Sequence, residues 1–302
     1  MDIAQKIINL RVPEGIVDAV LDTDTFNEID DQFAVAYMLR SKEKIRVQAM
    51  YAAPFLNYKV TSPEEGMEAS FQELKKIIGL CEETVPAFRG SGSFLPDEST
   101  PVDSPAARDL SERAKRYSPE HPLYVVAIGA ITNVASAILL DPSITENMVV
   151  VWLGGHALHY RDTCEFNMKQ DVAAARVVFG CGVPLVQLPC MGVVSEFHTS
   201  KPELLYWFSG KNSLSDYLSQ NVIEMMDHKA SGTPWSKVIW DVTAVAWLLN
   251  DGDCFMKSRL EQIHMPGYDH HYTLTPDEGF MRYIYSIHRD ALMKDLIQKI
   301  TE

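Results

Sequence analysis

Four aspartates after the first apolar run are the most informative feature of the chain. The run 16–21 ends at Asp22-Thr23-Asp24, and Asp30-Asp31 opens the next helical pattern. In open α/β sheets, ligands bind at this edge, where a strand ends and a helix begins. Like charges gathered there are costly unless something positive neutralises them. A helix N-terminus contributes only about 1 kcal/mol. A bound divalent cation is the stronger solution, and oxygen ligands favour Ca²⁺ or Mg²⁺.

Two other interpretations of these aspartates remain open at this point. In the simpler one, Asp30 is a helix N-cap and the others are solvated loop acids, which suits one or two aspartates better than four. In the second, Asp22-Thr23-Asp24-Thr25-Phe26 mimics a phosphatase of the haloacid dehalogenase type, with Asp22 as nucleophile and Asp24 as acid/base. That class also needs an acidic pair after a later strand, and it has no role for Asp30-Asp31.

Apolar runs that end in small or polar residues predict the strands that must position these acids. They lie at 16–21, 46–53, 123–128, 148–153 and 183–188. Helical periodicity predicts helices between them and after them, at 30–40, 66–80, 104–117, 133–140, 171–179, 201–205, 242–249 and 289–300. The alternation predicts an α/β fold: a doubly wound, mostly parallel open sheet, Rossmann-like, with helices on both faces.

We expect residues 1–302 to form a single domain. The segment 89–105 is rich in Ser, Gly and Pro and predicts a long surface loop or flap, and the helical, aromatic region 195–240 predicts a cap over the sheet. Met and aromatic residues at 204–208 and 217–226 are typical of core or subunit interface, and we expect a homodimer or homotetramer.

Composition excludes several partners. With 27 basic and 41 acidic residues the net charge is −14, and the pI is about 5.1, so no basic face for nucleic acid is expected. No apolar run approaches the roughly 18 residues that span a bilayer, so no membrane partner is expected. The N-terminal residues lack the pattern of a signal peptide. Five scattered cysteines without a CxxC pair indicate reduced thiols, and we expect a cytoplasmic protein.

Five segments, taken in order, resemble the inosine-uridine type nucleoside hydrolase family over roughly residues 16–255. The family opens with a strand, Asp-x-Asp, a turn and Asp-Asp; here the turn from Asp24 to Asp30 is two residues longer. The later matching segments are an Asn after the second strand, Gly-x-x-Thr-Asn, Gly-Gly followed by Glu-Phe-Asn, and a final metal aspartate. In this chain they correspond to Asn57, 129–133, 154–167 and Asp241.

The resemblance implies hydrolysis of the N-glycosidic bond of a small-molecule ribonucleoside to free base and ribose. It assigns Asp24, Asp31, Asp241 and the Thr132 carbonyl to Ca²⁺, which would bind water and the ribose 2′- and 3′-hydroxyls. Asp24 is then the candidate general base. The substrate-binding residues that the resemblance implies are Asp30 at a ribose hydroxyl, Glu165 and Asn167 at the sugar, and Asn57.

The residue before the last metal aspartate is Trp240, where many pyrimidine-accepting members have a His that acts as general acid. Purine-preferring members place a Trp there, which stacks on the base; a plain core Trp is the simpler alternative. His159 replaces an Asn that the family carries six residues before the Glu. These departures leave room for an altered substrate, and a non-catalytic binder of ribosyl ligands remains an alternative function. His156 and His159 suit a metal pair poorly and receive no role.

Overall fold

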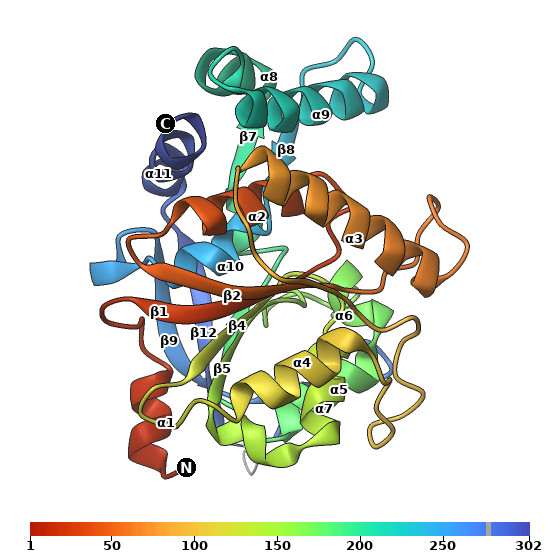
Figure 1. Cartoon of the computed structure of the whole chain (residues 1–302), viewed down its shortest axis with the longest axis vertical. Helices are drawn as coiled ribbons and strands as arrows, with labels where there is room; N and C mark the ends of the chain where they lie inside the picture. The colour runs from red at the N-terminus through yellow and green to blue at the C-terminus, as the bar shows by residue number, and fades with distance from the viewer. Residues whose placement is uncertain (276–278) are drawn as a thin grey trace.

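An eight-stranded sheet lies at the centre of the molecule (Figure 1). The computed structural model describes residues 1–275 and 279–302, and orders the strands β3-β2-β1-β4-β5-β6-β12-β9. Neighbouring strands are parallel except β12 and β9, which pair antiparallel at one edge. The strands are β1 (Val17–Thr23), β2 (Ile45–Ala52), β3 (Ala87–Arg89), β4 (Leu123–Ala127), β5 (Met148–Leu153), β6 (Leu185–Leu188), β9 (Met256–Gln262) and β12 (Phe280–Ile287). The predicted doubly wound, mostly parallel α/β sheet is confirmed.

Helices cover both faces of the sheet, as predicted (Figure 1). One face carries α2 (Asp31–Arg40), α3 (Pro63–Leu80), α10 (Val242–Trp247) and α11 (Arg289–Thr301). The other face carries α4 (Pro105–Ala114), α5 (Thr132–Leu140) and α7 (Val172–Gly180). Because side chains alternate along a strand, Leu21 and Val126 pack in the core of the first face, and Val20 and Val125 in the core of the second. The central strands are therefore apolar throughout, which made them visible in the sequence.

Strand order reverses beside β1 and places a ligand crevice there. The chain runs outward from β1 through β2 to β3, and then returns to β4 on the other side of β1. The loops after β1 and β4 consequently separate at the carboxyl edge of the sheet, which is the topological switch point where such folds bind ligands. The aspartates that follow β1 therefore lie at this point.

The sheet extends further than the sequence analysis predicted. Strand β9 was missed because it lies at an edge with only Met256 buried, so it shows no apolar run. Strand β12 was also not predicted, and β3 is only three residues long. Helix α3 begins at Pro63, before the predicted start at 66, because the Ser62 side chain caps it and proline suits the first turn.

The region 195–240 contains the helices that stand away from the sheet at the top of Figure 1. Its elements are β7 (His198–Ser200), α8 (Lys201–Glu203), a π-helix (Leu204–Phe208), α9 (Ser213–Lys229) and β8 (Ser236–Val238). The predicted helix 201–205 thus continues as a π-helical turn. No helix or strand lies between Arg89 and Pro105, a stretch that the structure describes completely.

Shorter elements complete the described chain. They are α1 (Ile3–Asn9), α6 (Phe166–Gln170), β10 (His264–Pro266) and β11 (Tyr272–Leu274), with 3-10 turns at Pro142–Glu146, Val194–Glu196 and Asp251–Asp253. Among the described residues, no helix is both long and apolar enough to cross a bilayer.

Candidate active site

A cavity of about 270 Å³ opens at the carboxyl edge of the sheet, over the switch point. Its walls come from the loop after β1, the first turn of α2, the ends of β4 and β5, the loop after β6, helix α6 and the start of α10. Six of the site residues expected from the sequence line it: Asp24, Asp30, Asp31, Glu165, Asn167 and Asp241. Trp240, expected to stack on a base, lines it as well.

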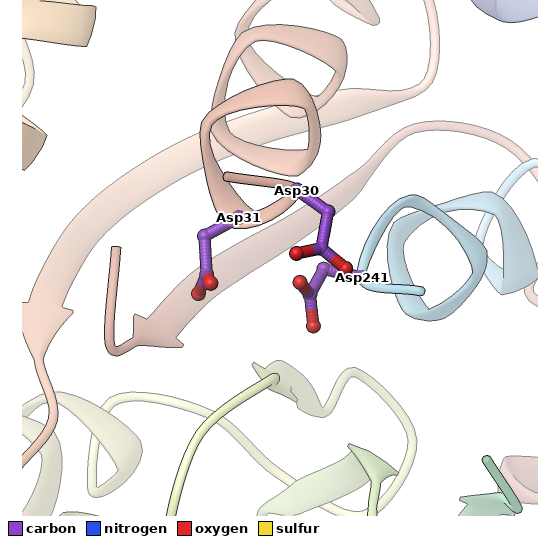
Figure 2. Close-up of side chains that lie close together, drawn as sticks. All are labelled: Asp30, Asp31 and Asp241. Atoms are coloured by element: carbon purple, nitrogen blue, oxygen red, sulfur yellow. The ribbon is translucent and has the colours of Figure 1, made fainter. Parts of the chain in front are cut away.

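Three carboxylates converge in this cavity (Figure 2). Asp30 and Asp31 stand at the start of α2, and Asp241 stands at the start of α10. One carboxylate oxygen from each lies within 4.8 Å of the others, and all three residues are buried. Two hydrogen bonds hold the cluster: the Thr23 hydroxyl donates to Asp31 (2.6 Å), and the backbone N–H of Trp240 donates to Asp30 (3.0 Å).

Asp24 reaches the same cavity from the end of β1 and is 1% exposed. Its Oδ2 is buried and has no hydrogen-bond partner among the residues that the structure describes. Gly129 makes room for this carboxylate, since a Cβ at that position would lie only 3.1 Å from the Asp24 carboxyl group. The glycine after β4 is therefore required by a close approach, and the unpartnered oxygen of Asp24, which lines the cavity, is open to a cation.

Burial and mutual repulsion perturb all of these acids. Burial, then the neighbouring Asp31 charge, raise the pKa of Asp24 well above its ordinary value. Burial and Asp30 raise the pKa of Asp31 to about 7, and burial and Asp31 raise that of Asp241 well above normal. Ionising the cluster is thus costly in protein alone, and a divalent cation would offset that cost. The donors are all oxygen, so the residues present fit a hard ion.

Lys237 on β8 provides a positive charge that the sequence analysis did not find. Its ammonium lies 2.5 Å from Glu28 and 3.5 Å from Asp30 Oδ1, and the residue is 8% exposed. Burial lowers the pKa of Lys237, but the charges of Asp30 and Glu28 outweigh that effect and leave it raised. Glu28 lies in the turn between Asp24 and Asp30, which is two residues longer than in the family pattern. That unusual length, together with a Lys four residues before Asp241, was the only available signal for the pair.

Glu165 and Asn167 lie opposite the aspartates, at α6. The Glu165 carboxylate caps the helix and accepts from the backbone N–H groups of Gly155 (3.0 Å), Asn167 (2.9 Å) and Met168 (2.9 Å). Asn167 Nδ2 donates to the carbonyls that end β4 and β5, at Ile128 (3.1 Å) and Leu153 (3.0 Å). These bonds fix the floor of the cavity between the two strands.

The structure does not bring Thr132 and Asn57 to the cavity. Thr132 is the first residue of α5, so its carbonyl points along the helix, and its hydroxyl donates to Asp171 (2.7 Å). Ile128, at the end of β4, lines the cavity instead. Asn57 donates to Asn27 Oδ1 (2.9 Å), and Asn27 lines the cavity in its place. The longer turn after Asp24 supplies Asn27 and accounts for this displacement.

Asp22 is buried behind the cavity and does not line it. Its Oδ1 accepts from Asn133 Nδ2 (2.7 Å), and burial raises its pKa to about 7, against the opposing effect of that hydrogen bond. A carboxyl group that no substrate reaches is unsuited to act as the nucleophile of a phosphatase.

Comparison with known proteins agrees with this geometry. A sequence model described as "inosine-uridine preferring nucleoside hydrolase" matches residues 19–274. The chain belongs to this family. Its members are metal-dependent nucleoside hydrolases, and the cluster of Asp30, Asp31 and Asp241 is a possible metal site.

Curated relatives of this chain match over shorter segments. Probable uridine nucleosidase 2 of Arabidopsis thaliana is 30% identical over 133 residues, which cover 43% of this chain and 40% of that protein. Non-specific ribonucleoside hydrolase RihC of Salmonella paratyphi B is 29% identical over 163 residues, 52% of this chain and 50% of the relative. The chain therefore spans about half the length, or less, of the curated relatives it matches.

Solved structures share the fold of the whole chain. A purine-preferring ribonucleoside hydrolase from Gardnerella vaginalis superposes with a TM-score of 0.74 at 18% identity, covering 94% of this chain and 98% of that one. The effector protein XOO4466 superposes with a TM-score of 0.72 at 15% identity, covering 99% and 97%. At these identities the likeness establishes the doubly wound architecture of the nucleoside hydrolases.

Proposed function

We propose that this protein hydrolyses the N-glycosidic bond of ribonucleosides to free base and ribose. The observation that carries the proposal is the group of buried carboxylates at the switch point, with an unpartnered oxygen on Asp24. Such bonds break through a sugar cation resembling an oxocarbenium ion, which carboxylates stabilise. Membership of the nucleoside hydrolase family and the names of the relatives support the same reaction.

The proposed cation is Ca²⁺, held by Asp24, Asp31, Asp241 and the main-chain carbonyl of Ile128 in place of Thr132. These oxygens suit a large, hard ion, and all four residues line the cavity. When bound, such an ion lowers the pKa of a water molecule and orients the ribose hydroxyls. In this proposal the raised pKa values of Asp24, Asp31 and Asp241 belong to the protein without its ion.

The side chains that line the cavity then have separate roles in the proposed reaction. Asp24, which can reach both cation and water, takes a proton from the attacking water as general base. Asp30 accepts a hydrogen bond from a ribose hydroxyl, in a position fixed by the Trp240 N–H and the Lys237 ammonium. Glu165 and Asn167 border the other side of the sugar, although the backbone donors around Glu165 leave its carboxylate little free capacity.

Trp240 is proposed to stack on the base. It is half-buried, lines the cavity and directly precedes Asp241, so its ring lies beside the carboxylates that would hold the ribose. Stacking of a base on an aromatic ring contributes about 1–3 kcal/mol, and a purine offers the larger surface. Purine nucleosides are therefore the proposed substrates.

The remaining proposals concern assembly and compartment. The π-helix exposes Leu205, Tyr206 and Trp207, which supports an interface in a homodimer or homotetramer and fits a cap formed by residues 195–240. All five cysteines are free thiols, which supports a reducing compartment such as the cytoplasm.

Product analysis tests the reaction. The purified protein is incubated with inosine, guanosine, adenosine, uridine and cytidine, and with a generic phosphoester, and ribose, base and phosphate are measured. We expect ribose and base in equal amounts from the purine nucleosides and no phosphate. Release of phosphate would restore the phosphatase alternative, and binding of ribosides without turnover would indicate a non-catalytic binder.

A further inference from the structure

His156 lines the cavity directly after the Gly154-Gly155 turn that ends β5. Backbone hydrogen bonds join this turn to the loop after β6: Cys190 N–H donates to the Gly155 carbonyl (2.8 Å), and Ala157 N–H to the Met191 carbonyl (3.0 Å). Between them, the backbone N–H of Met191 donates to Nδ1 of the His156 ring (3.4 Å). The imidazole is thus held by the main chain of two adjoining loops.

This contact determines which ring nitrogen carries the proton. A backbone N–H only donates, so Nδ1 must offer its lone pair, and the proton of the neutral ring is on Nε2. Burial lowers the pKa of His156, which favours the neutral ring at pH 7. No hydrogen bond from Nε2 occurs among the described residues, so the donor of a positioned ring is left for a ligand.

The ring is also confined from the side. Tyr160 lies 5.5 Å from it, centroid to centroid, at an interplanar angle of 46°. Gly192 in turn lies under the Tyr160 ring, because a Cβ at 192 would come within 2.5 Å of it. The imidazole therefore packs against the Tyr160 ring on one side, and the Met191 N–H contacts its Nδ1.

The position of His156 complements the carboxylates. Asp24, Asp30, Asp31 and Asp241 enter the cavity from β1, α2 and α10, whereas His156 and Met191 enter it from the loops after β5 and β6. A ribose held by the aspartates leaves the β5–β6 side for its base. Trp240 can stack on that base but cannot protonate it, so a hydrogen-bond donor for the base must come from another residue of the cavity wall.

On the basis of the proposed function, we propose that His156 donates a hydrogen bond from Nε2–H to the departing base. As the C1′–N bond breaks, its electron pair stays on the base nitrogen, and the hydrogen bond stabilises that negative charge while His156 keeps its proton. The water oxygen bonds to C1′, and its proton passes to Asp24 and then to solvent. The base takes its proton from solvent, so one water is consumed for each nucleoside.

Two substrates and three variants test this role. Inosine has a leaving group that needs the hydrogen bond, and 4-nitrophenyl riboside has one that needs none. His156→Phe removes the donor, and His156→Gln restores an N–H. His159→Phe is the control, because that residue is an exposed neighbour outside the cavity wall. We expect His156→Phe to lower kcat for inosine about 10- to 100-fold, the effect of one hydrogen bond to a charged group.

For 4-nitrophenyl riboside, kcat of His156→Phe should stay within about twofold, His156→Gln should recover part of the inosine rate, and His159→Phe should match the wild type. Equal losses on both substrates, or no loss on inosine, would overturn the role of His156 while leaving the hydrolase intact. A wild-type protein that cleaves neither substrate would instead overturn the proposed function and this role with it.

Discussion

The carboxylate side of the cavity and its base side are built in different ways. Asp30, Asp31 and Asp241 sit in the first turns of two helices, and Asp24 at the end of a strand, so regular elements fix all four. Trp240 and His156 face the base side, where backbone contacts between loops, such as the Met191 N–H on His156, fix the geometry. The sugar side thus depends on elements common to the fold. Residues on the base side can change, and with them the base that is accepted, without disturbing the sugar side.

The largest expected effect comes from breaking the carboxylate side. Asp24→Ala or Asp241→Ala should lower kcat/KM for inosine and for 4-nitrophenyl riboside alike by at least about 10³-fold, because both lose the general base or a cation ligand. Steady-state kinetics measure this, with Asp269→Ala as the exposed control. If either variant kept a tenth of the wild-type rate, these carboxylates would not form the reaction centre.

Removal of Lys237 should be the next largest effect. Lys237→Met leaves Asp30 without its buried counter-charge, so we expect kcat/KM to fall about 10- to 100-fold on both substrates. Lys237→Arg should recover part of the loss, and Lys211→Met serves as an exposed lysine control. A loss confined to inosine would mean that Lys237 serves the base side instead of positioning Asp30.

Trp240→Ala tests whether the base side of the cavity stacks on the base. Loss of one stack should raise the barrier for inosine by about 1–3 kcal/mol and leave 4-nitrophenyl riboside nearly unchanged. Rates for inosine and uridine measured with wild type and variant decide the point. Equal losses on inosine and 4-nitrophenyl riboside would make Trp240 structural, and a wild-type preference for uridine would refute purine stacking.

The smallest effect on activity is expected at Asp22, which lies behind the cavity. Asp22→Asn should keep kcat within about tenfold, whereas a phosphatase nucleophile would lose all turnover. Its effect on stability should depend on pH. The pKa of Asp22 is about 7 in the fold, against 3.8 as its ordinary value, so wild-type stability falls as pH rises from about 4 to about 7 and is flat above.

Asp22→Asn has no ionisable group at this position, so it does not lose this stability as the pH rises. In the presence of a chelator, Asp22→Asn should therefore be more stable than wild type by roughly 1–4 kcal/mol at pH 8 and nearly equal to it at pH 4. Urea unfolding at the two pH values measures the difference. A variant that is less stable at pH 8 would show that the Asp22 carboxylate is ionised and favourably paired in the fold.

The sequence allowed the regular elements to be predicted, and with them the carboxylate side. The central strands are continuous apolar runs, and Asp24 directly follows the first of them, at the edge of the sheet where Asp24, Asp30, Asp31 and Asp241 line one cavity. Edge strand β9 lacked such a run because one side faces solvent. Thr132 begins α5 and does not line the cavity, and the sequence pattern does not show which residue of 128–132 ends the strand and which begins the helix.

The contacts that fix side chains on both sides of the cavity could not be predicted, because they join segments that are distant in sequence. Lys237 meets Glu28 across 209 positions, and Met191 meets His156 across 35. No periodicity or motif records such a pairing, since it depends on how strands β5 and β6 and helices α2 and α10 come together. Asn57 likewise meets a residue distant in sequence, because it donates to Asn27 of the longer turn, and Asn27 lines the cavity.

The most direct test is a calcium titration of protein first stripped with a chelator, following ribose release from inosine. The carboxylates of Asp24, Asp31 and Asp241 predict no measurable release without the ion, saturable recovery as calcium is added, and no recovery in Asp241→Ala at any calcium concentration. Full release of ribose by the stripped wild-type protein would contradict the account.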